Sequence, residues 1–177
     1  ASPCCTAWCT WQALNEARYD RGDALRRERT AATVHLQFLI ELYQDQVAAG
    51  HYFVHEHPES AASWSLPMIQ QVLAWPTVNQ AVCDQCQYGV KAMSGPMKGS
   101  PVKKPTSFMS NSPEVLRQLS RRCSGRGGEC STSAGSHHVQ CKGRVVRDAA
   151  IYPRKLIRAF IRGFINQMRR DGTIKHG

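Results

Sequence analysis

The stretch that decides the fold class is "DALRRERTAATVHLQFLIELYQDQVAAGHYFVHEHP", residues 23–58. Its first part predicts a helix over 23–49, because apolar side chains recur with the spacing of one helix face. These side chains are Val34, Phe38 and Leu42, with Leu39 and Tyr43 beside them. The segment "HYFV" (51–54) then predicts a short buried strand. A long helix that leads directly into a short strand is typical of an α/β domain.

The rest of the chain continues this alternation. The pattern predicts a helix over 67–75, strands within 80–89 and 104–111, a short helix capped by Ser112, and a basic amphipathic helix over 153–170. Residues 122–144 are rich in Gly, Ser, Cys and His and predict an irregular loop. We therefore expect an α/β fold, the C-terminal half of an open Rossmann-like sheet, with a basic Cys/His-rich segment and a C-terminal helix.

Length and charge bound the function. The 177 residues suit one domain, at about 100–200 residues per domain. No apolar run is long enough to span a membrane. Lys and Arg outnumber Asp and Glu by 23 to 13, a net charge of +10, and most of this excess follows residue 90. A polyanionic partner such as DNA is therefore expected, although a basic charge can also serve solubility alone.

The chain carries eight cysteines in three groups. Adjacent Cys4 and Cys5 are poor disulfide partners for each other, and a domain of this size does not need disulfides for stability. We therefore expect a reducing, intracellular compartment, either nucleus or cytoplasm, with at least one thiol used in chemistry. The first residues lack the features of a signal peptide and enter directly at a motif, so a fragment of a longer protein is expected.

The segment "SPCCT" (2–6) places cysteines on a tight turn after a predicted strand. A thiol held there can face a cleft and act as a nucleophile. The alternative is a buried structural cysteine.

The segment "FVHEHP" (53–58) places Glu56 just past the end of the predicted strand, in the crevice expected for Cys5. A glutamate there can exchange protons with a bound heterocycle. His55 and His57 point to the other face of a strand. A rival interpretation is a metal site of His51, His55 and His57, as in a zinc-dependent nuclease or hydrolase.

These two motifs, in this order, resemble the DNA cytosine-5 methyltransferases. "SPCCT" is similar to the family's Ser/Gly-Pro-Pro-Cys turn, with Cys5 as the nucleophile and Cys4 at the second proline. "FVHEHP" is similar to its Glu-Asn-Val segment, with His57 at the asparagine. Downstream, "CQYG" and "KKPTSFMSN" resemble a block of Dcm-like and phage-type members, and "YPRKLIRAFI" resembles their terminal helix. The resemblance covers nearly the whole chain.

The resemblance implies a reaction. Cys5 would add to carbon 6 of a cytosine flipped out of duplex DNA, while Glu56 holds the base, so that carbon 5 accepts a methyl group from S-adenosylmethionine. Base-pocket support would come from Pro3, His57, Lys103 and Lys104. Phosphate contacts would come from Lys103, Lys104, Arg121, Arg122 and Arg126.

The sequence also departs from the family. The glycine-rich motif that binds S-adenosylmethionine would precede residue 1, so a missing N-terminal half is expected in cis or in trans. The chain would then be a partial catalytic domain, with catalytic motifs in 1–90, a basic loop and Cys/His-rich segment in 91–151, and a terminal helix in 152–177. The alternative is a non-catalytic nucleic-acid-binding remnant within a mobile-element polyprotein.

A third cluster could bind a metal. It offers three thiols and an imidazole, which suit a structural zinc ion, from Cys123, Cys130, Cys141 and either His137 or His138. The thiols can instead be plain reduced loop cysteines. The pair Cys83 and Cys86 has redox-motif spacing but falls in a predicted strand, where its thiols would point to opposite faces.

Overall fold

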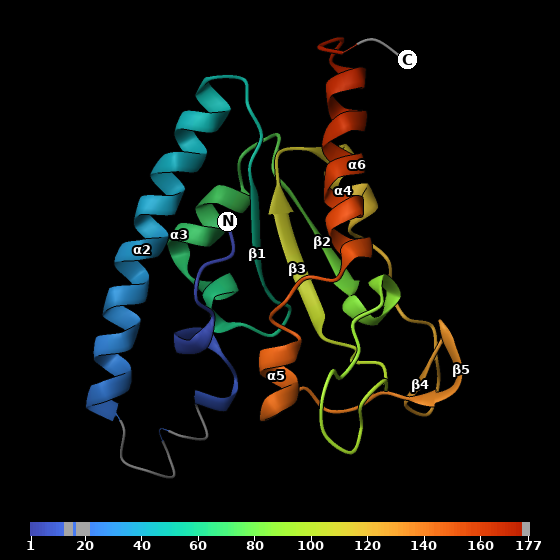
Figure 1. Cartoon of the computed structure of the whole chain (residues 1–177). Coiled ribbons are helices and arrows are strands. Elements are labelled where there is room, and N and C mark those ends of the chain that lie inside the picture. The colour runs from blue at the N-terminus through green and yellow to red at the C-terminus, as the bar shows by residue number, and fades with distance from the viewer. Residues whose placement is uncertain (13–15, 17–21, 175–177) are drawn as a thin grey trace. The chain divides into compact units, whose positions relative to one another are not determined.

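The computed structural model describes residues 1–12, 16 and 22–174. The fold is mixed α/β (Figure 1). The chain divides into two compact units, the first formed by residues 1–80 and 107–112, the second by residues 81–106 and 113–177. No helix in the described part of the chain is both long enough and apolar enough to cross a membrane.

The first unit is built around the long helix α2 (Gly22–Ala48) and the strand β1 (Val54–Pro58). It also contains three short helices, η1 (Thr6–Trp8), η2 (Ala62–Ser65) and α3 (Pro67–Leu73). The strand β3 (Pro105–Ser110) runs antiparallel to β1, because the start of β1 meets the end of β3: the Ser110 hydroxyl donates to the Phe53 carbonyl at 2.5 Å. The helices predicted at 23–49 and 67–75 are thus confirmed.

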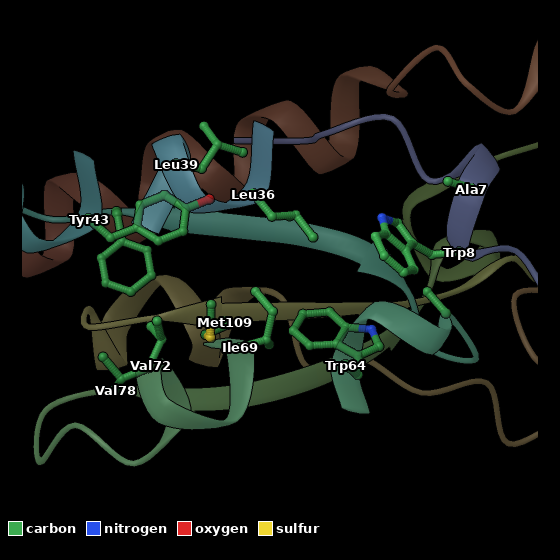
Figure 2. Close-up of a cluster of buried hydrophobic side chains, with 12 residues drawn as sticks. Ala7, Trp8, Leu36, Leu39, Tyr43, Trp64, Ile69, Val72, Val78 and Met109 are labelled. Atoms are coloured by element: carbon green, nitrogen blue, oxygen red, sulfur yellow. The ribbon is translucent and has the colours of Figure 1, made fainter. Parts of the chain in front are cut away.

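The core of the first unit is aromatic and aliphatic (Figure 2). Tyr43 and Phe53 stack with ring centroids 4.3 Å apart, and Ile69 is fully buried. The α2 side chains in this core are Leu36, Leu39 and Tyr43. Val34, Phe38 and Leu42, which define the apolar pattern in the sequence, are instead 61%, 54% and 40% exposed. The sequence therefore predicts the helix correctly, and of the five apolar side chains that it singles out only Leu39 and Tyr43 lie in the core.

The second unit contains the remaining elements. They are β2 (Asn79–Asp84, which begins in the first unit), η3 (Gln85–Tyr88), α4 (Pro113–Gln118), β4 (Glu129–Cys130), β5 (Ser133–His137), α5 (Arg144–Asp148) and α6 (Arg154–Arg170). The strand order of the larger sheet is β1-β3-β2, and β4 and β5 form a separate antiparallel pair. This pair lies in the segment predicted to be irregular, 122–144.

Helices α4 and α6 pack closely against each other in the second unit. Gly163 of α6 allows the approach, since a Cβ built there would lie 2.6 Å from the Cα of Val115. The side-chain oxygen of Gln167, which is buried, accepts a bond from the backbone N–H of Glu114 at 3.3 Å. The amphipathic helix predicted at 153–170 is confirmed, and its buried side rests on α4.

Candidate functional site

The first residues of the chain lie along β1. The Glu56 N–H donates to the Ala1 carbonyl at 2.8 Å, and the amine of Ala1 bonds the Val54 carbonyl. Bonds from one residue to the two neighbours of His55 are the pattern of parallel strands. The chain segment that carries "SPCC" therefore lies beside the strand that carries "HEH".

Glu56 occupies the middle of β1, which corrects the expectation that it follows the strand's end. The Ser2 hydroxyl donates to its carboxylate at 2.6 Å, and the Glu56 residue is 7% exposed. A carboxylate has about four lone-pair sites, and the Ser2 bond uses one of them, so this nearly buried carboxylate can also hold a polar ligand. The turn formed by residues 2–6, hereafter the motif turn, is thus joined to Glu56 directly by side chains.

Cys5 is half-buried and precedes the short helix η1, where its carbonyl accepts a bond from the Trp8 N–H at 3.0 Å. Cys4 is exposed, and its thiol bonds the Thr6 hydroxyl at 3.2 Å. A mostly apolar cavity of about 450 Å³ opens between this turn and α2. Its lining includes Pro3, Cys4 and Thr6 of the turn and His35 of α2. Cys4 is thus the cysteine on this cavity's wall.

The two histidines lie on the other face of β1. His55 Nδ1 and the Tyr43 hydroxyl are 2.9 Å apart, and the imidazoles of His55 and His57 meet edge to face at 4.9 Å. His57 bonds the Ser63 hydroxyl at 2.5 Å and the Pro3 carbonyl at 3.2 Å. The prediction that these histidines point away from Glu56 agrees with this arrangement.

Burial governs the protonation of both histidines. Burial first, then the charges of His57 and the amino terminus, lower the pKa of His55 to about 3. Burial also lowers the pKa of His57, against the opposing effects of Glu56 and of the bond to Pro3. Both imidazoles are therefore neutral and serve packing. His51, the third member of the rival metal set, is exposed.

A group that could hold a metal ion lies in the second unit. Cys86, Cys123, Cys130 and His138 bring their ligand atoms within 4.8 Å of one another. Three of the four belong to the set predicted from sequence, and Cys86 takes the place of Cys141. Cys141 instead packs against the small apolar cluster of Val90, Ala92, Val102 and Ala149. Three thiols and one imidazole are a ligand set typical of structural zinc.

The position of Cys86 explains why the sequence pattern does not place it in this group. The predicted strand at 80–89 ends at Asp84, and Cys86 lies in the tight turn of η3. This turn points its thiol to the group, while Cys83 stays fully buried in β2. The Cys-x-x-Cys spacing is only a partial signal for Cys86, because such a pair commonly supplies two ligands to zinc and Cys83 does not join this group.

Hydrogen bonds hold Cys123 in place within this group. The Cys123 thiol accepts from the Ser131 N–H at 3.4 Å and lies 3.6 Å from His138 Nε2. The Cys123 N–H donates to the Asp84 carboxylate at 2.8 Å, and Arg122 pairs with the same carboxylate at 3.2 Å. Hydrogen bonds of this kind, made by the residues around a metal site, orient the ligands.

The thiols of the group differ in acidity. Burial raises the pKa of Cys86 to about 12. Burial also acts to raise the pKa of Cys123, but bonds from Ser131 and from the Gly125 N–H outweigh it and lower that pKa to about 6. One thiolate is therefore favoured in this group even before a cation adds its own charge.

The predicted phosphate-binding residues fall into different environments. Lys104 has a positive φ of 37° and donates its ammonium to the Ala149 carbonyl at 2.7 Å, so a structural contact engages it. Lys103 is half-buried, and Arg122 is paired with Asp84. Arg121 lies over the ring of Tyr88, 5.7 Å from its centroid, and Arg126 is exposed.

Comparisons of the chain with protein-family models, with curated proteins and with solved structures found no match.

Proposed function

We propose that the chain carries the nucleophile and base-binding part of a DNA cytosine-5 methyltransferase active site. Cys5 is the nucleophile and Glu56 is the acid that holds the base. The observation that carries this proposal is the docking of residues 1–3 on β1. The Ser2 hydroxyl bonds the Glu56 carboxylate, the Glu56 N–H bonds the Ala1 carbonyl, and His57 bonds the Pro3 carbonyl. Two motifs some fifty residues apart in sequence thereby come to one place.

The covalent step follows from these two side chains. The Cys5 thiolate forms a bond to carbon 6 of cytosine, and the C5–C6 double bond breaks. Its electrons move through the ring to nitrogen 3, which takes a proton from Glu56. Carbon 5 then becomes nucleophilic. The reverse steps return the proton and release the thiolate, so the adduct is reversible until carbon 5 reacts.

S-adenosylmethionine would supply an electrophilic methyl group to carbon 5. The described residues offer no glycine-rich turn between a strand and a helix, followed by an acidic residue for the ribose, so they do not fit this cofactor. The addition of the thiolate can be tested without a methyl donor.

The test uses duplex DNA that contains 5-azacytosine, whose ring nitrogen at position 5 makes carbon 6 more electrophilic. We expect an adduct that survives denaturing electrophoresis, and its loss in Cys5→Ser, because a hydroxyl without an adjacent base is a poor nucleophile. Glu56→Gln should slow adduct formation at least about 100-fold, the usual size of a general-acid contribution.

Two neighbouring thiols serve as matched controls, since Cys4→Ser and Cys9→Ser make the same chemical change nearby. Both should keep the adduct. Cys4 lines the cavity beside the turn, so a loss of adduct in Cys4→Ser with retention in Cys5→Ser would assign the nucleophile to Cys4 and contradict the proposal. No adduct in any variant would favour a non-catalytic nucleic-acid-binding role.

We also propose that the Cys86, Cys123, Cys130 and His138 group binds one structural zinc ion. The observation that favours it is that four ligand atoms, one from η3 and three from residues 123–138, lie within 4.8 Å of one another. The two-residue strand β4 and the strand β5 have little apolar core of their own. A zinc ion would supply the missing stabilisation of this segment.

Elemental analysis of the purified protein tests this site. We expect one zinc per chain, and loss of the zinc in Cys86→Ser. Cys141→Ser is the matched control, because Cys141 is a ligand candidate by sequence but packs in an apolar cluster. Retention of zinc in Cys86→Ser, or its loss in Cys141→Ser, would contradict the assignment.

A further inference from the structure

A second cavity, in the second unit, is surrounded by positive charge. It measures about 180 Å³. Its lining comprises Tyr88, Gln118, Arg121, Lys155, Arg158, Ala159 and Arg162. Four of these seven residues are cationic and none is acidic. Only Arg121 belongs to the set that the sequence predicts for nucleic-acid binding.

The packing of α6 fixes this arrangement. Lys155, Arg158 and Arg162 recur at intervals of three and four residues, so they lie along one face of the helix. Buried Leu156 and Ala159 hold that helix against its unit. The opposite wall is held by the Tyr88 hydroxyl, which donates to the Gln118 carbonyl at 2.7 Å. The cations are thus presented by ordered backbone.

Their charges are not neutralised within the described part of the chain. No ion pair there involves Arg121, Lys155, Arg158 or Arg162. Nearby arginines differ, because Arg117 and Arg170 pair with Glu114, at 2.6 Å and 3.7 Å. Like charges gathered around one hollow repel each other, and a bound anion would relieve that repulsion.

A further hollow of about 140 Å³ shares Lys155 with this cavity. Its lining adds Lys91, the hydroxyl residues Thr132 and Ser133, and the backbone turn at Gly89. The Lys155 stem runs along this turn, because its Cδ lies 3.8 Å from where a Cβ of Gly89 would be, an ordinary van der Waals distance. Two basic hollows that share a lysine suit two successive phosphates of a strand better than one small anion.

We propose that these adjoining hollows, hereafter the α6 phosphate track, bind consecutive phosphate groups of a nucleic-acid strand. Arg121, Arg158 and Arg162 contact one phosphate, Lys91 contacts the next, and Lys155 serves both. The inference rests on the proposed function for the class of ligand, since a base enters the Cys5 site only on a nucleic acid. It involves residues of the other unit and needs no catalysis.

Salt-dependent binding of labelled duplex DNA to the full chain, followed by fluorescence anisotropy, tests this track. The binding constant is measured between about 50 and 200 mM salt for wild type and for Arg158→Gln/Arg162→Gln. We expect the slope of the logarithm of the binding constant against that of salt to fall by about 1 for each phosphate that the variant no longer neutralises. Lys155→Gln alone should lower the slope and weaken binding.

Arg144→Gln and Arg154→Gln together are the matched control. Both residues are exposed, line neither hollow and make no ion pair within the described residues, so the double variant removes two unpaired positive charges as well. A control slope that falls as much as that of Arg158→Gln/Arg162→Gln would overturn the track in favour of diffuse attraction. A melting temperature equal to wild type confirms that a weakened variant is folded.

Two further measurements complete the test. One distinguishes nucleic-acid phosphate from free phosphate, and the other distinguishes this proposal from the proposed covalent chemistry. We expect inorganic phosphate to compete with DNA only at concentrations far above that of the DNA phosphate groups. Tight binding of inorganic phosphate with unchanged DNA affinity in the α6 variants would overturn the nucleic-acid assignment. Cys5→Ser should bind DNA with the wild-type slope, so failure of the covalent chemistry and failure of the track give different results.

Discussion

At the scale of single residues, the two faces of β1 have different roles: one presents the candidate catalytic residue and the other packs in the core. Its alternation points Glu56 toward Ser2 and points His55 and His57 into a buried cluster with Tyr43 and Trp64. His55 Nε2 has no hydrogen-bond partner within the described residues. A buried imidazole without a second partner is stable only when it is neutral.

The lowered pKa of His55 predicts a loss of stability in acid. Its pKa is about 3 in the folded chain and 6.5 in the reference state, so between these values the unfolded chain binds more protons. The free energy of unfolding should therefore fall as pH drops from about 6.5 toward 3, by at most about 1.4 kcal/mol per pH unit from this group.

Urea unfolding at a series of pH values measures this dependence. His55→Leu should show a shallower dependence on pH, whatever its absolute stability. His51→Leu is the control, since His51 is exposed, and it should keep the wild-type dependence. Equal slopes for wild type and His55→Leu would rule out His55 as the titrating group.

At the scale of elements, the sequence predicts which helices and strands form better than it predicts where they begin and which face they bury. The long helix is predicted to within a residue at each end, but α2 carries two apolar stripes of similar spacing. Only tertiary packing decides that Leu36 and Leu39 face the core and that Phe38 does not. Likewise β1 covers Val54–Pro58 instead of the expected 51–54, so Glu56 lies within the strand and not beyond its end.

The close contact of α4 and α6 gives an element-scale prediction. Gly163→Ala should lower the free energy of unfolding by about 1–3 kcal/mol, because the new methyl group meets the Val115 backbone, which has no flexible end to move. This cost exceeds the gain of about 1 kcal/mol that alanine brings to a helix interior.

Thermal or urea unfolding checks the sign. Gly22→Ala in α2 is the control, since nothing lies within 4 Å of the position of its added Cβ, and it should be neutral or slightly stabilising. A Gly163→Ala variant more stable than wild type would show that α4 and α6 are not in close contact.

At the scale of the whole molecule, what the sequence leaves undetermined is which distant residues meet. Cys123, Cys130 and His138 are near in sequence and are predicted together, whereas Cys86 joins them only through the fold of the second unit. The basic charge predicts an anionic partner. Ion pairs with Asp84 and Glu114, invisible in sequence, decide which arginines remain available.

The central claim is that Cys5, assisted by Glu56, adds to cytosine. Exchange of hydrogen at carbon 5 tests it most directly, because addition at carbon 6 makes carbon 5 basic and lets it exchange with solvent without a methyl donor. We predict that DNA tritiated at carbon 5 of cytosine releases tritium to water with the wild-type chain, at least about 100-fold more slowly with Glu56→Gln, and not with Cys5→Ser. Exchange that persists in Cys5→Ser, or that is absent when the α6 phosphate track still binds the DNA, would contradict the claim.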